Sequence, residues 1–465
     1  MGPHVEPLPS ATPAIRCLLG VFCLLPIPTL LLWRRRSDRV RLSVCAIWFD
    51  ARQPGVDMTS HATARVLLVA PFPYSESAGQ GGATVCARSL ALLRQAFDVG
   101  MVCFSMGSTE DRRAENELRG ELAHFESVPM SITKPKVARA KLLSLLLQPE
   151  HTHYFNVPAM HEALNRAIDR FRPDFVIYQF PQMAQYLPRN EVSYKKIVDV
   201  QDAYSVSWFR RACTSGPSLT KIYAYLQWLG WIQYERQHYS SADQVWTLSA
   251  QDKFGLSAYS PSLNPIVMGL PLDTPAPSLP PLISQQAPNP DNGPCVGFIC
   301  SFGHPPNVEA LMFLNQQIAP RIQHTHPSLR FLIAGRNPPQ ALVSSAPSNV
   351  SFLGFVDSLP DFYASCDLVV APLLSGGGIK IKVAEALAYG KALVATSIGV
   401  EGLDIEHGRH FLLANSAEDF VAQIQKLLSD PALRQHLQAQ ANLAAQDRLN
   451  GQTWLNRVKD ALLTA

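Results

Sequence analysis

The sequence lacks the cysteine pattern of disulfide-rich or zinc-stabilised proteins. Its nine cysteines form no CxxC pair, and most lie in apolar runs such as Val296–Cys300. Small secreted domains carry cysteine frameworks, and zinc sites need paired Cys or Cys/His ligands at short spacing. We therefore expect buried free thiols in a reducing compartment and no metal site.

An excess of charge of one sign is also missing. The chain has 40 basic and 37 acidic residues, a net charge of +3, and no basic stripe in its body. A nucleic-acid-binding surface needs clustered Lys and Arg, so nucleic acid is not an expected partner. With 47% hydrophobic and 17% charged residues, the sequence is typical of a globular protein. A length of 465 residues predicts two or three domains.

A long apolar run occurs only near the N-terminus. Cys17–Trp33 has about the minimum length for crossing a bilayer, is interrupted by Pro26 and Pro28, and precedes three arginines. Those arginines would place its C-terminal side in the cytoplasm, and the scarcity of charge before the run argues against a secretory signal. Two interpretations stay open. Either the protein is cytoplasmic and held at the inner face of the membrane, or the residues before Met58 are an extension from a misplaced start.

From Ala64 onward, strand and helix patterns alternate. A buried strand at 65–70 leads through a glycine-rich turn at 77–82 into a helical pattern at 83–96 and a second strand at 99–104. Parallel strands joined by helices imply an α/β sheet. The same alternation restarts at Cys295 and continues to the C-terminal helices.

A proline-rich stretch separates the two halves. Eight prolines lie between Gly269 and Pro294, where they would break any regular element. The predicted fold class is α/β, with two Rossmann-like domains facing a central cleft, the default ligand site in such sheets. The predicted organisation is an N-terminal extension at 1–57, an N-terminal domain at 58–270, a linker at 271–294, a C-terminal domain at 295–430 and C-terminal helices at 431–465.

The glycines of the second half predict a phosphate site. A strand ends in Gly376, Gly377 and Gly378, and a helix is expected to begin at about Ile379. Glycine lets a ligand approach backbone N–H groups closely, and a helix start carries partial positive charge. We therefore expect this loop to bind a diphosphate.

Three charged residues follow that loop. Lys380 and Lys382 offer cationic donors, and Glu385 lies three residues beyond Lys382 on nearly the same helix face. A carboxylate beyond a phosphate site can accept hydrogen bonds from ribose or sugar hydroxyls. The structural alternative is a set of solvated lysines with Glu385 paired to Lys382.

These segments resemble the GT-B glycosyltransferases, specifically glycosyltransferase family 4 (group 1) and its relatives, over roughly Ala64 to Gln446. The strongest match is Gly376–Ala388, where the family has a glycine-rich loop, a basic residue and a Glu-Ala-Met-Ala-like helix. Shorter segments follow the family's order of landmarks: Gly79–Gly82, Gly303–Glu309, Ile333–Gly335, Gly354–Val356 and Ser365–Asp367.

The resemblance implies a hexosyltransferase-like enzyme that moves a sugar from a nucleotide-sugar donor to an unidentified acceptor: a polysaccharide, a glycolipid or a small molecule. It implies retention at the anomeric carbon and no metal or other cofactor. Asp202 and Glu385 are the catalytic candidates. The donor-binding candidates are Gly81, Gly82, His304, Asn307, Gly376, Gly377, Gly378, Ile379, Lys380, Lys382 and Glu385. Asn307 is also expected to cap the helix that begins at about Val308.

The sequence departs from the family at two places. The first of two family glutamates falls at Gly377, and Gln201-Asp202 stands where many members have a histidine. These losses favour an alternative of another class, a catalytically silent protein of the same fold that binds a nucleotide sugar or a partner. A dinucleotide dehydrogenase is disfavoured, because no Gly-x-Gly-x-x-Gly follows a strand.

Overall fold

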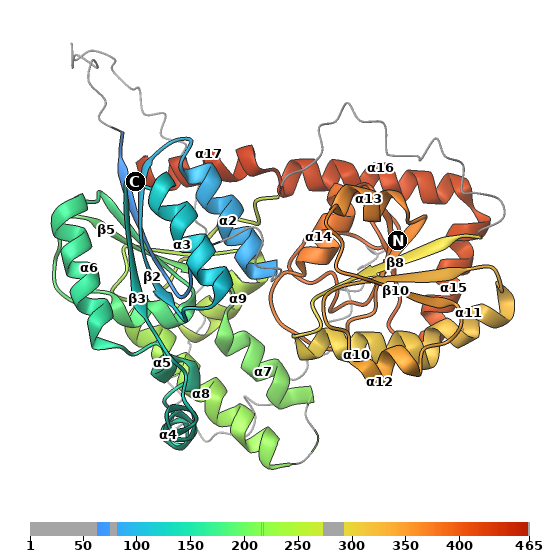
Figure 1. Cartoon of the computed structure of the whole chain (residues 1–465), viewed down its shortest axis with the longest axis horizontal. Coiled ribbons are helices and arrows are strands. Elements are labelled where there is room, and N and C mark those ends of the chain that lie inside the picture. The colour runs from blue at the N-terminus through green and yellow to red at the C-terminus, as the bar shows by residue number, and fades with distance from the viewer. Residues whose placement is uncertain (1–62, 75–80, 215, 217, 273–292, 464–465) are drawn as a thin grey trace, which may run out of the picture. The chain divides into compact units, whose positions relative to one another are not determined.

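The computed structural model describes residues 63–74, 81–214, 216, 218–272 and 293–463. These residues form two parallel sheets covered by helices (Figure 1). The first sheet has the strand order β3-β2-β1-β4-β5-β6-β7. Its strands are β1 (Arg65–Ala70), β2 (Asp98–Ser105), β3 (His124–Pro129), β4 (Phe175–Gln179), β5 (Lys195–Val200), β6 (Gln244–Thr247) and β7 (Ile266–Val267).

Burial on both faces explains why these strands are apolar runs rather than alternating patterns. Val66 to Ala70 of β1 are all fully buried, with helices on either side of the sheet. The helices of this half are α2 (Gly81–Leu93), α3 (Thr109–Glu121), α4 (Lys134–Ser144), α5 (Glu150–Tyr154), α6 (Pro158–Phe171), α7 (Tyr204–Thr214), α8 (Leu219–Tyr239) and α9 (Ala250–Tyr259), with the 3-10 helix η2 (Pro181–Tyr186).

The second sheet has the order β10-β9-β8-β11-β12-β13. Its strands are β8 (Cys295–Ile299), β9 (Arg330–Ala334), β10 (Val350–Gly354), β11 (Leu368–Ala371), β12 (Ala392–Ala395) and β13 (Leu412–Leu413). The helices are α10 (Pro305–Phe313), the π-helix η4 (Leu314–Ile318), α11 (Ala319–Thr325), α12 (Gln340–Ser344), α13 (Leu359–Ala364), α14 (Ile381–Ala388), α15 (Ala417–Ser429), α16 (Pro431–Arg448) and α17 (Gly451–Leu463). The predicted fold class, α/β with two Rossmann-like domains, is confirmed.

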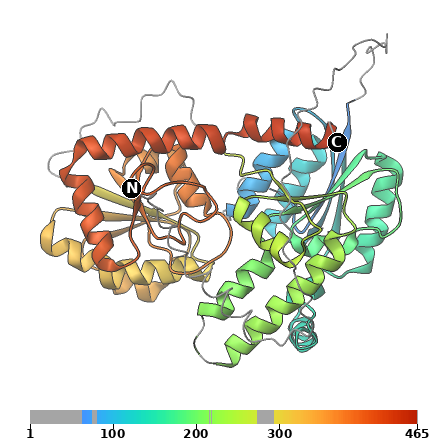
Figure 2. The same cartoon turned by 180° about the vertical axis from the view of Figure 1, so that it is seen from behind.

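The last two helices, α16 and α17, pack against different sheets. Leu437 and Ala441 of α16 belong to the cores around the second sheet. Trp454 and Leu455 of α17 instead join the core of the first sheet, and α17 packs against α2 (Figure 2). The end of the chain therefore returns to the N-terminal half.

Two helix starts differ from the sequence prediction. α10 begins at Pro305 with His304 at its N-cap, so Asn307 lies inside the first turn and its predicted capping role was wrong. α14 begins at Ile381 with Lys380 at its N-cap, slightly after the expected start at about Ile379. The later start follows from the extended backbone of Lys380, with φ of −89° and ψ of +98°, so that helical geometry begins only at the next residue.

The described cysteines are free, and Cys86, Cys103, Cys300 and Cys366 are buried, as the apolar context predicts. In the part of the chain that the structure describes, no helix is both long and apolar enough to cross a membrane. The predicted extension at 1–57, the turn at Gly79 and most of the linker, 273–292, lie outside the described residues.

Candidate functional site

The glycine loop after β11 packs over the partly buried side chain of Lys380. Gly376 and Gly378 have φ values of +111° and +62°, which L side chains rarely adopt. The Nζ atom of Lys380 donates hydrogen bonds to the carbonyls of Gly377, at 2.9 Å, and Gly378, at 2.6 Å. Burial lowers the pKa of Lys380. A cation therefore lies directly beneath the loop, rather than on the solvated surface.

Gly377 packs closely against residues of the N-terminal half. A Cβ atom at this position would lie 2.0 Å from the Oγ of Ser207 and 3.4 Å from the Oδ1 of Asp202. No side chain fits there unless Ser207 moves. The glutamate that the resemblance expects at this position is thus excluded by packing, and the carboxylate of Asp202 lies next to the place it would enter.

Asp202 follows β5 and faces the same loop. Ser207 Oγ donates to its Oδ1 at 2.9 Å. Burial raises the pKa of Asp202, while Ser207 and the charge of Lys380 oppose that rise. A second contact joins the halves nearby, because Arg210 of α7 pairs with Glu401, which also accepts a 2.8 Å hydrogen bond from Gln251.

A buried hydrogen-bond network fixes the strand ends that lead to Asp202. Gln179 Nε2 and Gln201 Nε2 both donate to Asp199 Oδ2, at 3.1 and 2.6 Å, and Tyr74 donates to Gln179. Burial raises the pKa of Asp199 to about 6. Gln201, at the place of the family histidine, is therefore bound to Asp199 and helps to position its neighbour Asp202.

The start of α7 is held by a second buried carboxyl group. The backbone N–H of Ser205 donates to Glu235 Oε1 of α8 at 3.1 Å. Burial raises the pKa of Glu235 to about 8. Since α7 begins two residues after Asp202, Glu235 anchors the segment that carries this candidate.

Lys382 is joined to the first loop of the C-terminal half. Its Nζ donates to Asn307 Oδ1 and lies 5.6 Å from the centroid of the Phe298 ring. Asn307 Nδ2 donates to the carbonyl of Ser301 at 2.6 Å. Burial lowers the pKa of Lys382 to about 8. The structure thus gives Asn307 the role of orienting a lysine.

His304 lies in that same loop, at the N-cap of α10. Burial lowers the pKa of its imidazole, and Lys382 and Lys380 lower it further. The two loops also meet at Ser375, whose Oγ donates to Glu309 Oε2 at 2.5 Å. His304, Asn307, Lys380 and Lys382 therefore form one polar cluster with the glycine loop, and the two lysines supply its positive charge.

Glu385 lies on α14 with only 14% of its side chain exposed. Its Oε1 is 4.0 Å from Arg88 Nη1 of α2. Burial raises the pKa of Glu385 to about 7, opposed first by Arg88 and then by Lys382. The alternative of a solvated carboxylate paired with Lys382 does not describe this residue.

The remaining candidates, Gly81 and Gly82, border a segment that lies outside the described residues. Gly81 and Gly82 are the first residues of α2, directly after residues 75–80. α2 carries Arg88, which sequence reasoning missed, as it missed Ser207 and Arg210. A basic residue on the helix after a glycine-rich turn was the available clue to Arg88; no local pattern marks the other two. Among the described residues, no group of three His, Cys, Asp or Glu side chains could hold a metal ion.

Comparison with known proteins agrees with this arrangement. Residues 293–430 match the family model described as "Glycosyl transferases group 1". An uncharacterised 44.6 kDa protein in the cps region of Klebsiella pneumoniae is 25% identical over 137 residues, which are 27% of this chain and 35% of that protein. The chain thus matches only about a third of the length of that relative.

Solved structures resemble nearly all of the described chain. Sucrose-phosphate synthase from Thermosynechococcus elongatus has a TM-score of 0.62 at 16% identity, covering 85% of this chain and 98% of that one. HepE from Anabaena, in complex with UDP and glucose, has a TM-score of 0.58 at 15% identity, covering 86% and 100%. At these identities the likeness shows the fold, which is GT-B, and the predicted similarity to group 1 glycosyltransferases is confirmed.

Proposed function

We propose that this protein is a glycosyltransferase that moves a sugar from a nucleoside-diphosphate donor to the hydroxyl group of an acceptor. The observation that carries the proposal is the cluster at the start of α14, where a glycine loop, two partly buried lysines and the partly buried Glu385 meet. Loops of this kind bind phosphates through backbone N–H groups and cations, and a neighbouring carboxylate suits sugar hydroxyls. The match of residues 293–430 to group 1 glycosyltransferases supports the same function.

The donor would be held by three kinds of contact. Its diphosphate would lie on the N–H groups of 376–379, with Lys382 and Lys380 nearby, and its ribose hydroxyls would donate to Glu385. A phosphate would compete with Asn307 for Lys382, which retains most of its positive charge at neutral pH because its pKa is about 8. The described contact between Glu385 and Arg88 would hold the carboxylate in place.

The chemical step breaks the bond between the anomeric carbon and the diphosphate oxygen and forms one to the acceptor oxygen, whose hydroxyl proton passes to the leaving diphosphate. Negative charge develops on the leaving diphosphate, and preorganised cations and N–H groups stabilise it. We assign that work to the glycine loop, Lys380 and Lys382. Asp202, which faces Gly377, would stabilise the positive charge that develops on the sugar ring. We also propose retention at the anomeric carbon and no requirement for a metal, so that activity persists in EDTA.

The acceptor belongs to the hydroxyl-bearing polymers, lipids or small molecules on which such enzymes act. We propose that the reaction occurs in the cytoplasm, at the inner face of the membrane if the apolar segment 17–33 is an anchor.

A screen of nucleotide sugars tests this function. A ligand that binds the folded state raises the melting temperature by mass action. We expect one nucleotide sugar to do so, and the same compound to be hydrolysed slowly without an acceptor. Binding without any hydrolysis or transfer would instead show a catalytically silent protein, and no response to any nucleotide sugar would refute the proposal.

A further inference from the structure

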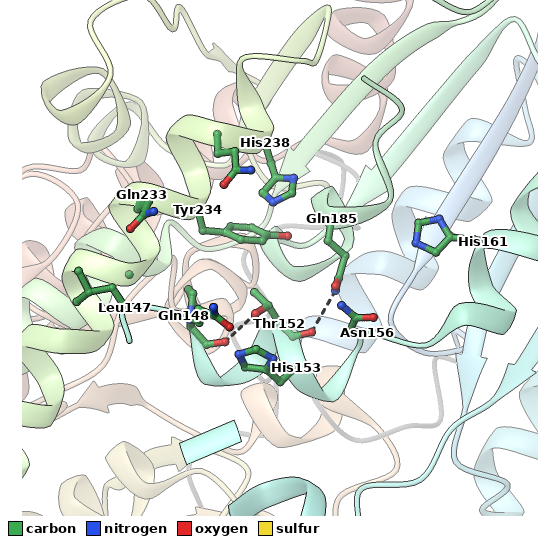
Figure 3. Close-up of a pocket in the computed structure, with 13 residues that line it drawn as sticks. Leu147, Gln148, Thr152, His153, Asn156, His161, Gln185, Gln233, Tyr234 and His238 are labelled. Atoms are coloured by element: carbon green, nitrogen blue, oxygen red, sulfur yellow. Dashed lines mark hydrogen bonds between the residues drawn. The ribbon is translucent and has the colours of Figure 1, made fainter. Parts of the chain in front are cut away.

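A second site lies in the N-terminal half, away from the glycine loop. A cavity of about 380 Å³ opens among α5, η2, α6 and α8. We name it the amide pocket, because it is lined by the side-chain amides of Gln148, Asn156, Gln185, Gln233 and Gln237, with three histidines and Tyr234 (Figure 3). Its volume falls within the range of small-ligand sites, roughly 300–1,000 Å³.

The lining carries no fixed charge. None of the described residues that line the cavity is Asp, Glu, Lys or Arg, although Arg189 and Arg139 lie close enough to lower the pKa of His238 and of His153. Two of the histidines are neutral at physiological pH: burial lowers the pKa of His238 to about 4 and lowers that of His153 as well. Since charged ligands need opposite charges when they leave water, this lining does not suit a phosphate or a carboxylate.

Amide and imidazole groups can both donate and accept hydrogen bonds, as hydroxyl groups do. Gln185 Nε2 is fixed by the carbonyls of Thr152, at 3.3 Å, and Gln182, at 2.8 Å, which leaves Oε1 as an acceptor (Figure 3). Polar atoms thus remain available for a ligand with many hydroxyl groups.

One wall of the pocket is the ring of Tyr234, which packs tightly against its neighbours. The Tyr234 ring lies 4.3 Å from that of His238 and 5.2 Å from that of Trp231, between centroids. Behind it, α8 approaches Leu147 so closely that a Cβ on Gly230 would lie 2.8 Å from the Leu147 carbonyl oxygen. Leu147 itself has a φ of +59°, a strained conformation for leucine that persists where the surroundings impose it.

The amide pocket and Asp202 follow neighbouring strands of the first sheet, β4 and β5. η2, which carries Gln185, follows β4 directly, and β4 pairs with β5, which leads to Asp202. Tyr234 OH donates to the carbonyl of Pro181, the first residue of η2, at 3.0 Å. The pocket therefore lies beside the carboxyl ends of the central strands.

We propose that the amide pocket binds a neutral saccharide unit. The amides match its hydroxyl groups, and the ring of Tyr234 packs on the C–H face of a sugar. That this saccharide belongs to the acceptor rests on the function proposed above; the binding itself does not.

Ligand-observed NMR on the full chain tests the proposal with glucose, galactose, N-acetylglucosamine and maltose, and with glucuronic acid as the charged comparison. Saturating nucleoside diphosphate is added to occupy the donor site. We expect at least one neutral sugar to bind, and Asn156→Ala combined with Gln233→Ala to weaken it by about tenfold or more. Both side chains are exposed, so the fold should tolerate their loss.

Two further variants make the result decisive. Gln435→Ala, an exposed glutamine on α16, should bind sugar like the parent protein. Gln233→Trp, which fills the pocket, should abolish sugar binding without changing nucleotide affinity. The proposal is wrong if no neutral sugar binds, if the double variant binds as well as the parent, or if glucuronic acid binds best. A failure of nucleotide binding alone would refute the proposed function and leave the sugar result standing.

Discussion

The glycine-loop cluster and the amide pocket differ most in charge. The first gathers the partly buried charges of Lys380, Lys382 and Glu385, while the described lining of the second has no fixed charge. Buried charges are costly unless they meet a partner, so a site that keeps them indicates a charged ligand. A neutral lining of amides indicates a ligand that offers hydrogen bonds alone. The two proposed sites would thus suit two ligands of different charge, as the proposed transfer reaction requires.

The largest effect should come from Asp202. In Asp202→Asn the amide oxygen still accepts the hydrogen bond from Ser207, so the loop keeps its shape while the negative charge is lost. Removing one group that stabilises transition-state charge lowers turnover by about 100-fold or more. Steady-state kinetics should show this fall in kcat with nucleotide affinity unchanged. Asp169→Asn, at an exposed position on α6, serves as the control. An unchanged kcat would remove Asp202 from the mechanism.

Gly377 tests whether the contact between the halves matters. A methyl group there collides with Ser207, so Gly377→Ala should lower activity by about tenfold, through displacement of the loop. Gly377→Ala combined with Ser207→Gly removes the obstacle and should recover most of the loss. Gly120→Ala, where nothing lies within 4 Å, should behave like the parent protein. Full activity in the single variant would show that the loop is free to move.

Donor affinity should depend on pH in two directions. The pKa of Glu385 is raised to about 7, so its accepting carboxylate forms as the pH rises through 7. The pKa of Lys382 is lowered to about 8, so its charge is lost as the pH rises further. Calorimetric titration with the nucleotide sugar should give the tightest binding between these values. In Glu385→Gln, donor affinity should no longer fall at low pH but should still fall at high pH. A donor affinity in the parent protein that does not change with pH would contradict both assignments.

The smallest effect on ligand binding is expected at Glu235, whose carboxyl group holds the start of α7 and is tested through stability. Its pKa is raised to about 8 in the folded protein, against about 4.3 unfolded, so the folded state binds the proton more tightly. Stability is therefore lost as the pH rises from the unfolded value towards 8. Glu235→Gln needs no proton, so it should gain about 4–5 kcal/mol at pH 8 and only about 1 kcal/mol near pH 5. Melting curves at both values, with exposed Glu162→Gln as the control, measure the difference.

The sequence predicted the elements of the fold well, because its strands are uninterrupted apolar runs bounded by glycine and proline. The three glycines and two lysines of 376–382 were found for the same reason: close spacing in the chain keeps them close in space. Asn307 was given the wrong local role, since its partner Lys382 is distant in sequence.

The parts that sequence could not predict depend on contacts between segments far apart. Ser207 faces Gly377 and Arg88 faces Glu385 only once the two halves are assembled. The amide pocket draws on four helices, and each of its glutamines is by itself an ordinary polar residue, three of them on helices and Gln148 in the turn before α5. No periodicity or motif distinguishes such residues before folding.

The central claim is that Glu385 binds the ribose of a nucleotide donor while the loop at 376–379 binds its diphosphate. Isothermal titration of nucleoside diphosphate and of inorganic diphosphate into the parent protein, Glu385→Gln and Glu385→Ala tests it directly. A hydrogen bond to a charged group contributes about 1.5–3 kcal/mol, so alanine should weaken nucleotide binding by about tenfold or more, with glutamine in between. Inorganic diphosphate, which lacks ribose, should bind all three proteins alike. Unchanged nucleotide affinity in Glu385→Ala, or an equal loss for both ligands, would contradict the assignment.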